Sequence, residues 1–258
     1  MQKFDETTIT DIQNIIREAG KIAVESQADL VVRYKSDRSP VSDAEMRIEK
    51  LIIKYLQNNF PGDQIISEES GVVSQPAART WVLDPIDGTR VYIKGLPTWG
   101  ILLGLLEEGK PSLGFFNMAK ANDFFWGGPA YGAFRNTTRL PECPRIPVDD
   151  PVSFLAVPAD MHLHFKVDYP RVRSLGSTAA NFCYVAQGSA IGVLSPHINI
   201  WDIAGVLPIL EATGISYEFL SGASLELSDY FNGQKLPGDV LASHPDLMPV
   251  LRGMIHPI

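Results

Sequence analysis

The chain has 258 residues, of which 45% are hydrophobic and 20% charged, and its mean hydropathy is +0.02. This composition is typical of a globular protein with a large core and argues against disorder. Thirty acidic against 22 basic side chains give a net charge of -8, which argues against sequence-independent binding to nucleic acid or to an anionic membrane, because both require clustered positive charge.

The start of the chain and its cysteines indicate a compartment. The first residues, MQKFDETTIT, are polar and acidic where a secretory signal requires a basic residue followed by an apolar run. No segment is apolar for long enough to span a bilayer. Cys143 and Cys183 lie far apart and do not form a disulfide framework, which favours buried small side chains. We therefore expect a cytoplasmic protein.

Two amphipathic helices are predicted first, over residues 10–28 and 43–59, because apolar residues recur there with the helical period. The polar stretch 33–43 between them is predicted to be a solvated loop. Short strands are expected at QIISEES (64–70) and TWVLDP (80–85).

The following segments predict a mainly antiparallel sheet. The run 99–120 reads as two buried strands around the turn EEGKPS, and the glycines of 123–136 indicate a further hairpin. Four prolines within 140–151 mark the best candidate boundary. We expect two halves, residues 1–140 and 151–258, packed as one compact unit.

The second half alternates between strands and helices, which suggests an α/β arrangement. Strands are expected at SFLAVPA (153–159) and IGVLSP (191–196), and helices at STAANFCYVAQG (177–188) and WDIAGVLPILEATG (201–214). Pro208 falls about two turns into the last of these helices and should kink or break it, because proline lacks the backbone N–H.

The motif LDPIDGT carries the first chemical signal. Pro85 keeps Asp84 extended, so the side chains of Asp84 and Asp87 point into one space. Gly88 and Thr89 then open a helix whose first free amides suit a phosphate oxygen. Mg²⁺ prefers a few carboxylates with water and phosphate oxygens, which favours a metal bridged to a phosphate. Asp-Pro and Asp-Gly are also ordinary turn dipeptides, so the motif alone leaves both interpretations open.

Two further acidic sites support the metal interpretation. Glu68 and Glu69 end the strand that precedes Asp84, although a solvated loop would also tolerate them. Asp202 begins a predicted helix, where a cap is the simpler explanation. Because all three acidic sites lie at element ends, the sequence predicts a carboxylate cluster.

The blocks SEES, WVLDPIDGT and WDIAGVLPILEATG, in this order and spacing, resemble the signature of the inositol monophosphatase superfamily across essentially the whole chain. The resemblance implies an α+β fold, a layered α-β-α-β-α sandwich of the inositol monophosphatase and fructose-1,6-bisphosphatase type. It also implies Mg²⁺-dependent hydrolysis of a small phosphorylated alcohol, two or three Mg²⁺ ions, inhibition by lithium and a homodimer.

The resemblance also implies roles for individual residues. One metal would activate the attacking water and another would stabilise the leaving alkoxide, without a covalent enzyme intermediate. Thr89 would orient the water, with Glu69 nearby. The implied metal ligands are Glu68, Asp84, Asp87, Asp202 and the backbone carbonyl of Ile86, with Asp87 also counted as catalytic; the implied substrate contacts are Gly88, Thr89, Gly176, Ser177, Thr178 and Ser195.

The chain departs from the pattern at several positions. Ser42 and Glu45 stand where the family carries Thr-x-x-Asp, which affects a third, loosely held metal. Ser195 replaces a glutamate of the inositol-binding relatives, seven residues before Asp202, and therefore weakens inositol as the substrate. The loop DGTRVYIKGLPTWG resembles the histidinol-phosphatase branch. Its Arg90 could meet the substrate or pair with a neighbouring carboxylate, and we expect the pairing.

Several alternatives remain open at this point. Histidinol phosphatase and 3′(2′),5′-bisphosphate nucleotidase are rival activities, and a regulatory or binding protein that retains the fold is the non-enzymatic alternative. Neither a P-loop nor a GxGxxG motif is present. His162 and His164 would face one side of a strand, and without a third ligand at suitable spacing they are expected to be a surface or partly buried pair.

Overall fold

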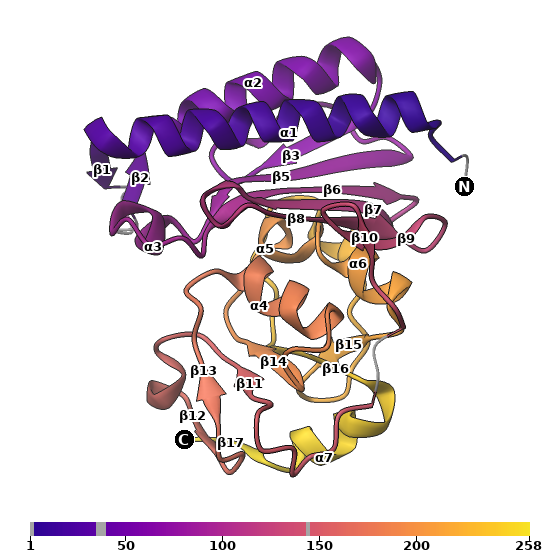
Figure 1. Cartoon of the computed structure of the whole chain (residues 1–258). Helices are drawn as coiled ribbons and strands as arrows, with labels where there is room; N and C mark the ends of the chain where they lie inside the picture. Colours follow the sequence, from indigo (N-terminus) through magenta and orange to yellow (C-terminus); the bar gives the residue numbers. More distant parts are fainter. Residues whose placement is uncertain (1–2, 35–39, 143–144) are drawn as a thin grey trace.

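The computed structural model describes residues 3–34, 40–142 and 145–258. Five layers are stacked along the molecule (Figure 1). Helices α1 (Glu6–Ser26) and α2 (Asp43–Asn59) cover one face of a large sheet, and α4 (Thr178–Ala186), α5 (Ile200–Ile203) and α6 (Leu207–Ala212) cover its other face. A smaller sheet and α7 (Met248–Arg252) follow. The predicted α-β-α-β-α sandwich is confirmed.

The first helix begins four residues before the predicted start at residue 10, because Asp5 caps it. The carboxylate of Asp5 accepts a hydrogen bond from the backbone N–H of Thr8 at 2.7 Å. The helix buries a stripe with the helical period against the sheet, formed by Ile9, Ile12, Ile16, Ala19 and Ala23. The second helix has the predicted bounds.

The described part of the stretch predicted as a loop forms a small antiparallel ladder instead. Strand β1 (Val32–Tyr34) pairs with β2 (Pro40–Ser42), with Val32 opposite Ser42. Pairing satisfies the backbone groups of this polar segment, and of its side chains only that of Ser42 is buried among the residues of the two strands. Residues 35–39, the middle of the predicted loop, lie outside the described residues.

The large sheet has eight strands in the order β10-β9-β8-β7-β6-β5-β3-β4. Every neighbouring pair is antiparallel except β3 with β5, so the prediction of a mainly antiparallel sheet is confirmed. Its strands are β3 (Gln64–Ser67), β4 (Gly71–Val72), β5 (Arg79–Asp87), β6 (Gly100–Glu107), β7 (Lys110–Met118), β8 (Asp123–Gly128), β9 (Gly132–Arg135) and β10 (Thr138–Arg139), and the short helix α3 (Thr89–Ile93) follows β5.

The second sheet has the order β13-β11-β14-β16-β15, and β11 runs parallel to both of its neighbours. A separate pair, β12 with β17, lies near the C-terminus. The bounds are β11 (Leu155–Ala156), β12 (Phe165–Val167), β13 (Val172–Arg173), β14 (Gly192–Ser195), β15 (Ser216–Phe219), β16 (Val240–Ser243) and β17 (Ile255–Pro257). Strands and helices alternate in this half as expected.

Two local predictions in this half have different outcomes. Pro208 lies in the first turn of α6, and the segment 201–214 is broken into α5 and α6 as predicted. The expected strand at His162 is wrong, because residues Met161–Leu163 form a 3₁₀ helix. His164 packs edge-on against His197, with ring centroids 5.1 Å apart.

The two halves share buried surface. One core cluster combines Val82 and Leu102 of the large sheet with Phe182 of α4 and Leu207 of α6. Cys183 is buried in the same cluster, as expected for a small apolar side chain, whereas Cys143 lies outside the described residues. Within residues 3–34, 40–142 and 145–258, none of the helices has the length and apolar character of a bilayer-spanning segment.

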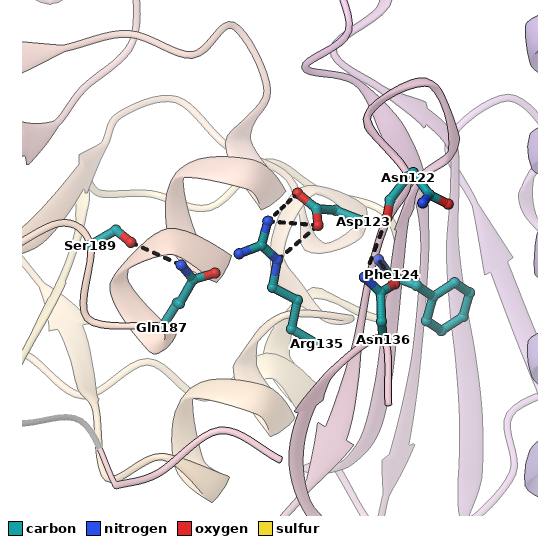
Figure 2. Close-up of polar contacts among 7 residues, drawn as sticks. All are labelled: Asn122, Asp123, Phe124, Arg135, Asn136, Gln187 and Ser189. Carbon is teal, nitrogen blue, oxygen red and sulfur yellow. Dashed lines mark hydrogen bonds and ion pairs between the residues drawn. The ribbon is translucent and has the colours of Figure 1, made fainter. Parts of the chain in front are cut away.

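A polar contact lies beside this shared core. Arg135 of β9 donates two hydrogen bonds to the carboxylate of the buried Asp123 of β8, at 2.7 and 2.8 Å. Figure 2 shows the guanidinium group on the side of the sheet that faces the end of α4, where Gln187 donates to Ser189 at 3.0 Å. The bidentate geometry satisfies a charge that would otherwise be costly to bury.

Glycine residues let the turn between α5 and α6 lie directly on the large sheet. A methyl group at Gly104 of β6 would overlap the carbonyl oxygen of Ala204, and one at Gly114 of β7 would overlap that of Gly205. The backbones therefore touch without intervening side chains. This close approach fixes where α5, and with it Asp202, lies over the sheet.

The Gly114→Ala substitution should lower the free energy of unfolding by about 2–3 kcal/mol, because the added methyl group overpacks a backbone contact. Chemical denaturation measures this change. Gly253→Ala is the matched control, since the nearest atom to its new Cβ is 3.4 Å away and φ is -67°. Equal stability of the Gly114 variant and the wild-type protein would contradict the close packing.

Candidate active site

A hollow of about 250 Å³ opens at the ends of β3 and β5, beside the starts of α3, α4 and α5. Four of its eleven described lining residues carry a carboxylate, unlike the apolar lining typical of pockets for large ligands. The lining residues are Pro40, Glu68, Asp84, Ile86, Asp87, Gly88, Thr89, Arg90, Gly176, Thr178 and Asp202.

The end of β5 brings its two aspartates into the hollow. The pairing of β5 with β6 shifts register between Asp84 and Asp87, and Asp84 accepts a hydrogen bond from the backbone N–H of Ile86 at 3.0 Å. Gly88 has φ +91° and opens α3, as predicted. Its missing side chain matters because a Cβ there would approach the carbonyl oxygen of Gly176 to 3.1 Å.

The third aspartate comes from the second half of the chain. Asp202 is the third residue of α5, and Asn199 is the cap residue. Asp202 takes part in the capping box at the start of this helix, so the simpler explanation as a capping residue holds beside the metal interpretation. The carboxylate of Asp202 accepts a hydrogen bond from the backbone N–H of Asn199 at 2.6 Å. Side-chain oxygens of Asp84, Asp87 and Asp202 all lie within 4.8 Å of one another.

Burial of three carboxylates together changes their acidity. Burial raises the pKa of Asp87 to about 6 and the pKa of Asp202 to about 8. Burial also raises the pKa of Asp84 well above its usual range, and the charges of Glu68, Asp87 and Asp202 raise it further. A bound cation would remove both the desolvation cost and the repulsion, so this donor set fits a divalent metal such as Mg²⁺.

The carboxylate of Asp87 also anchors α4. It accepts hydrogen bonds from the hydroxyl of Ser177 and from the backbone N–H groups of Thr178 at 3.1 Å and Ala179 at 2.9 Å. These bonds favour the charged carboxylate and partly offset the effect of burial on its pKa. They join the end of β5 to the start of a helix ninety residues later.

The predicted substrate contacts have different places in the structure. Gly176, Thr178 and Gly88 line the hollow. Ser177 is buried with its hydroxyl bonded to Asp87, which leaves it outside the lining. Ser195 ends β14 as a buried side chain and is also outside the lining.

Of the two glutamates after β3, one lines the hollow and the other does not. Glu68 lines the hollow, and its backbone N–H donates to the carbonyl of Leu83 at 3.1 Å. Glu69 is half-buried in the turn before β4 and does not line the hollow. The structure therefore brings Glu68, and not Glu69, to the aspartates.

Glu45 has a contact that the sequence did not reveal. It is buried, and its carboxylate accepts a hydrogen bond from the hydroxyl of Thr89 at 2.7 Å and one from the hydroxyl of Ser42 at 2.8 Å. Ser42 and Glu45 also form the capping box that starts α2. Burial raises the pKa of Glu45 to about 7. The spacing Ser-x-x-Glu was a signal for the capping box only.

Arg90 corrects another prediction. It is exposed at the start of α3 and lines the hollow. In the part of the chain that the structure describes, Arg90 forms no ion pair, so the expected pairing with a neighbouring carboxylate is wrong. It is the one lysine or arginine among the described residues of the lining.

The layered fold and the buried aspartates together place the chain among the metal-dependent phosphatases. The comparison with protein families narrows this class, because residues 3–244 match the inositol monophosphatase family. Since this match spans nearly the whole chain, the protein belongs to that family.

The relatives similar to this chain carry the names of different functions. The chain is 28% identical over 210 residues to a histidinol-phosphatase of Mycobacterium tuberculosis, covering 76% of this chain and 80% of the relative. It is also 28% identical over 256 residues to the Nus factor SuhB of Pasteurella multocida, covering 93% and 92%. A solved IMPase/NADP phosphatase complexed with Mg²⁺ and phosphate shares the fold, with a TM-score of 0.83 at 19% identity, covering 96% of this chain and 95% of that one.

The buried aspartates predict how stability depends on pH. Their pKa values are raised in the folded state, so the folded protein binds more protons than the unfolded chain between about pH 4 and about pH 8. Without metal, the free energy of unfolding should fall as the pH rises through this window. Mg²⁺ should therefore stabilise the protein more at about pH 8 than at about pH 5.5.

Thermal unfolding with a chelator or with Mg²⁺, measured across this range, tests the prediction. Asp202→Asn should flatten the pH dependence of the metal-free protein. If the midpoint temperature of unfolding of the metal-free protein rises steadily with pH, the raised pKa values of the aspartates are contradicted.

Proposed function

We propose that the protein is a Mg²⁺-dependent phosphatase that hydrolyses a small phosphate monoester with metal-activated water. The observation that carries this proposal is the convergence of Asp84, Asp87 and Asp202, whose side-chain oxygens lie within 4.8 Å of one another, with Asp84 and Asp87 buried and Asp202 half-buried. Like charges are costly to bury without a counter-ion, and Mg²⁺ is the usual counter-ion at carboxylates that meet a phosphate.

Five groups are assigned to two or three Mg²⁺ ions: Glu68, Asp84, Asp87, Asp202 and the carbonyl oxygen of Ile86. When bound, the ions supply a water of lowered pKa and positive charge for the developing alkoxide. The solved IMPase/NADP phosphatase complexed with Mg²⁺ and phosphate, which shares the fold, supports this assignment. Inhibition by lithium, a homodimer and a cytoplasmic location are proposed on the family resemblance.

Thr89 is assigned the role of orienting the attacking water. Its hydroxyl donates to Oε1 of Glu45 at 2.7 Å and lies 3.2 Å from the carbonyl oxygen of Ile86. Because the hydroxyl proton is directed at Glu45, the lone pairs of the Thr89 oxygen are free to accept a hydrogen bond from water. Glu69 lies off the lining, and we assign it no step.

The alcohol of the substrate is assigned to the side of the hollow formed by Gly176 and Thr178. Ser195 brings no charge where inositol-binding relatives carry a glutamate, so we propose histidinol phosphate ahead of inositol 1-phosphate. The relative named histidinol-phosphatase supports this order. All five proposed metal-binding groups are present and line one hollow, which argues against the regulatory alternative.

Phosphate release from histidinol phosphate, inositol 1-phosphate, 3′-phosphoadenosine 5′-phosphate and fructose 1,6-bisphosphate, with and without Mg²⁺, tests the proposal. One compound should be hydrolysed far faster than the others, and only with metal. Asp84→Asn should lower this rate about a thousandfold, because a lost ligand forfeits several kcal/mol of transition-state stabilisation.

The same variant controls for folding. Asn keeps the shape of Asp84 and removes one of the mutually repelling charges, so the metal-free Asp84→Asn protein should unfold at a higher temperature than the wild type. Folded wild-type protein that releases no phosphate from any compound would favour the regulatory alternative.

Thr89→Val tests the role of the hydroxyl. Valine has nearly the same shape but neither donates nor accepts, so kcat should fall about a hundredfold while KM changes little. Thr89→Ser keeps the hydroxyl and should retain most of the activity. Steady-state kinetics on the best substrate separate the two constants, and an unchanged kcat in Thr89→Val would remove this residue from the mechanism.

A further inference from the structure

Arg90 lies in the first turn of α3, directly after Gly88 and Thr89, and it lines the hollow. Its side chain is exposed and, within the described ranges, it takes part in no ion pair. Four carboxylates line the same hollow. A cation that is left unpaired so close to carboxylates is available for another anion.

The balance of charge indicates which anion that is. The four carboxylates of Glu68, Asp84, Asp87 and Asp202 carry four negative charges when ionised, and two Mg²⁺ ions match them. A phosphate monoester then adds about two negative charges at neutral pH. Of the lining residues that the structure describes, Arg90 alone brings a permanent positive charge to meet them.

The position of Arg90 indicates which part of the substrate it meets. Arg90 follows Asp87 by three residues and lies in α3, the helix whose first amides the sequence predicts to suit a phosphate oxygen. Gly176 and Thr178, assigned to the alcohol, come from the start of α4 instead. A guanidinium group can donate two parallel hydrogen bonds to two oxygens of one phosphate.

We propose that Arg90 binds the non-bridging oxygens of the phosphate group that is hydrolysed, and that it therefore acts as a phosphate-binding residue for every substrate of the enzyme. This inference rests on the proposed phosphatase function. It gives the chain a phosphate contact made by a side chain, in addition to the metals.

Inorganic phosphate in the presence of Mg²⁺ is the direct probe, because it lacks the alcohol altogether. Isothermal titration calorimetry on the full chain should show that Arg90→Ala raises the Kd for phosphate by about 10- to 100-fold. This is the loss in affinity expected when a hydrogen bond between charged groups is removed. The Kd of Arg90→Lys should lie between those of the wild type and Arg90→Ala, since lysine keeps the charge but lacks the planar guanidinium group.

Lys94→Ala is the matched control. Lys94 is the exposed residue at the C-cap of the same helix and does not line the hollow. Its replacement by alanine changes the net charge by the same amount as Arg90→Ala. It should leave the Kd for phosphate within about twofold of the wild-type value, because an exposed charge at that range is screened. Equal weakening by Lys94→Ala and Arg90→Ala would overturn the contact in favour of a long-range field.

Kinetics supply the second readout. Arg90→Ala should raise KM by a similar factor for monoesters of different alcohols. A higher KM only for substrates with a second anionic group, with phosphate affinity unchanged, would place Arg90 at the alcohol and overturn the inference. If the wild-type protein binds phosphate and turns over substrate, and the Arg90→Ala variant does both equally well, this inference alone is overturned. If the wild-type protein does neither, the proposed function is overturned as well.

Discussion

The mutual repulsion of Asp84, Asp87 and Asp202 is the constraint on which the rest of the structure depends. Their oxygens lie within 4.8 Å of one another, with Asp84 and Asp87 buried and Asp202 half-buried, and burial raises the pKa of each group. Unfavourable contacts of this kind persist at functional sites because the surrounding fold is stable enough to hold them. Here the core shared by both halves supplies that stability.

Packing of the α5–α6 turn against the large sheet is how the fold imposes this arrangement. Gly104 and Gly114 allow the turn to touch the backbones of β6 and β7, and Pro208 starts a new helix immediately afterwards. A side chain at either glycine would lift α5 from the sheet and move Asp202 away from the other two aspartates. The geometry of the site is therefore set by residues that contribute no polar group to it.

The sequence predicted the parts of the structure that depend on local pattern. The period of apolar residues located α2 and the strands from β5 to β9, and the position of acidic residues at element ends predicted the cluster. It did not predict contacts between distant segments, such as Thr89 with Glu45 or Asp87 with Ser177, because no local pattern encodes a contact across 44 or 90 residues. The expected ion pair of Arg90 was wrong for the same reason, since proximity in sequence to acidic residues does not fix where a long side chain points.

The anchoring of α4 by Asp87 has a consequence for how this protein can change over evolutionary time. The same carboxylate that faces the hollow also receives three hydrogen bonds from the start of that helix. A descendant that gave up hydrolysis could replace Asp84 at little structural cost and relieve repulsion in doing so. Replacing Asp87 would also leave the start of α4 without its partner. Lineages that turn this fold to another purpose should therefore lose Asp84 first and keep Asp87 long after it has ceased to serve a reaction.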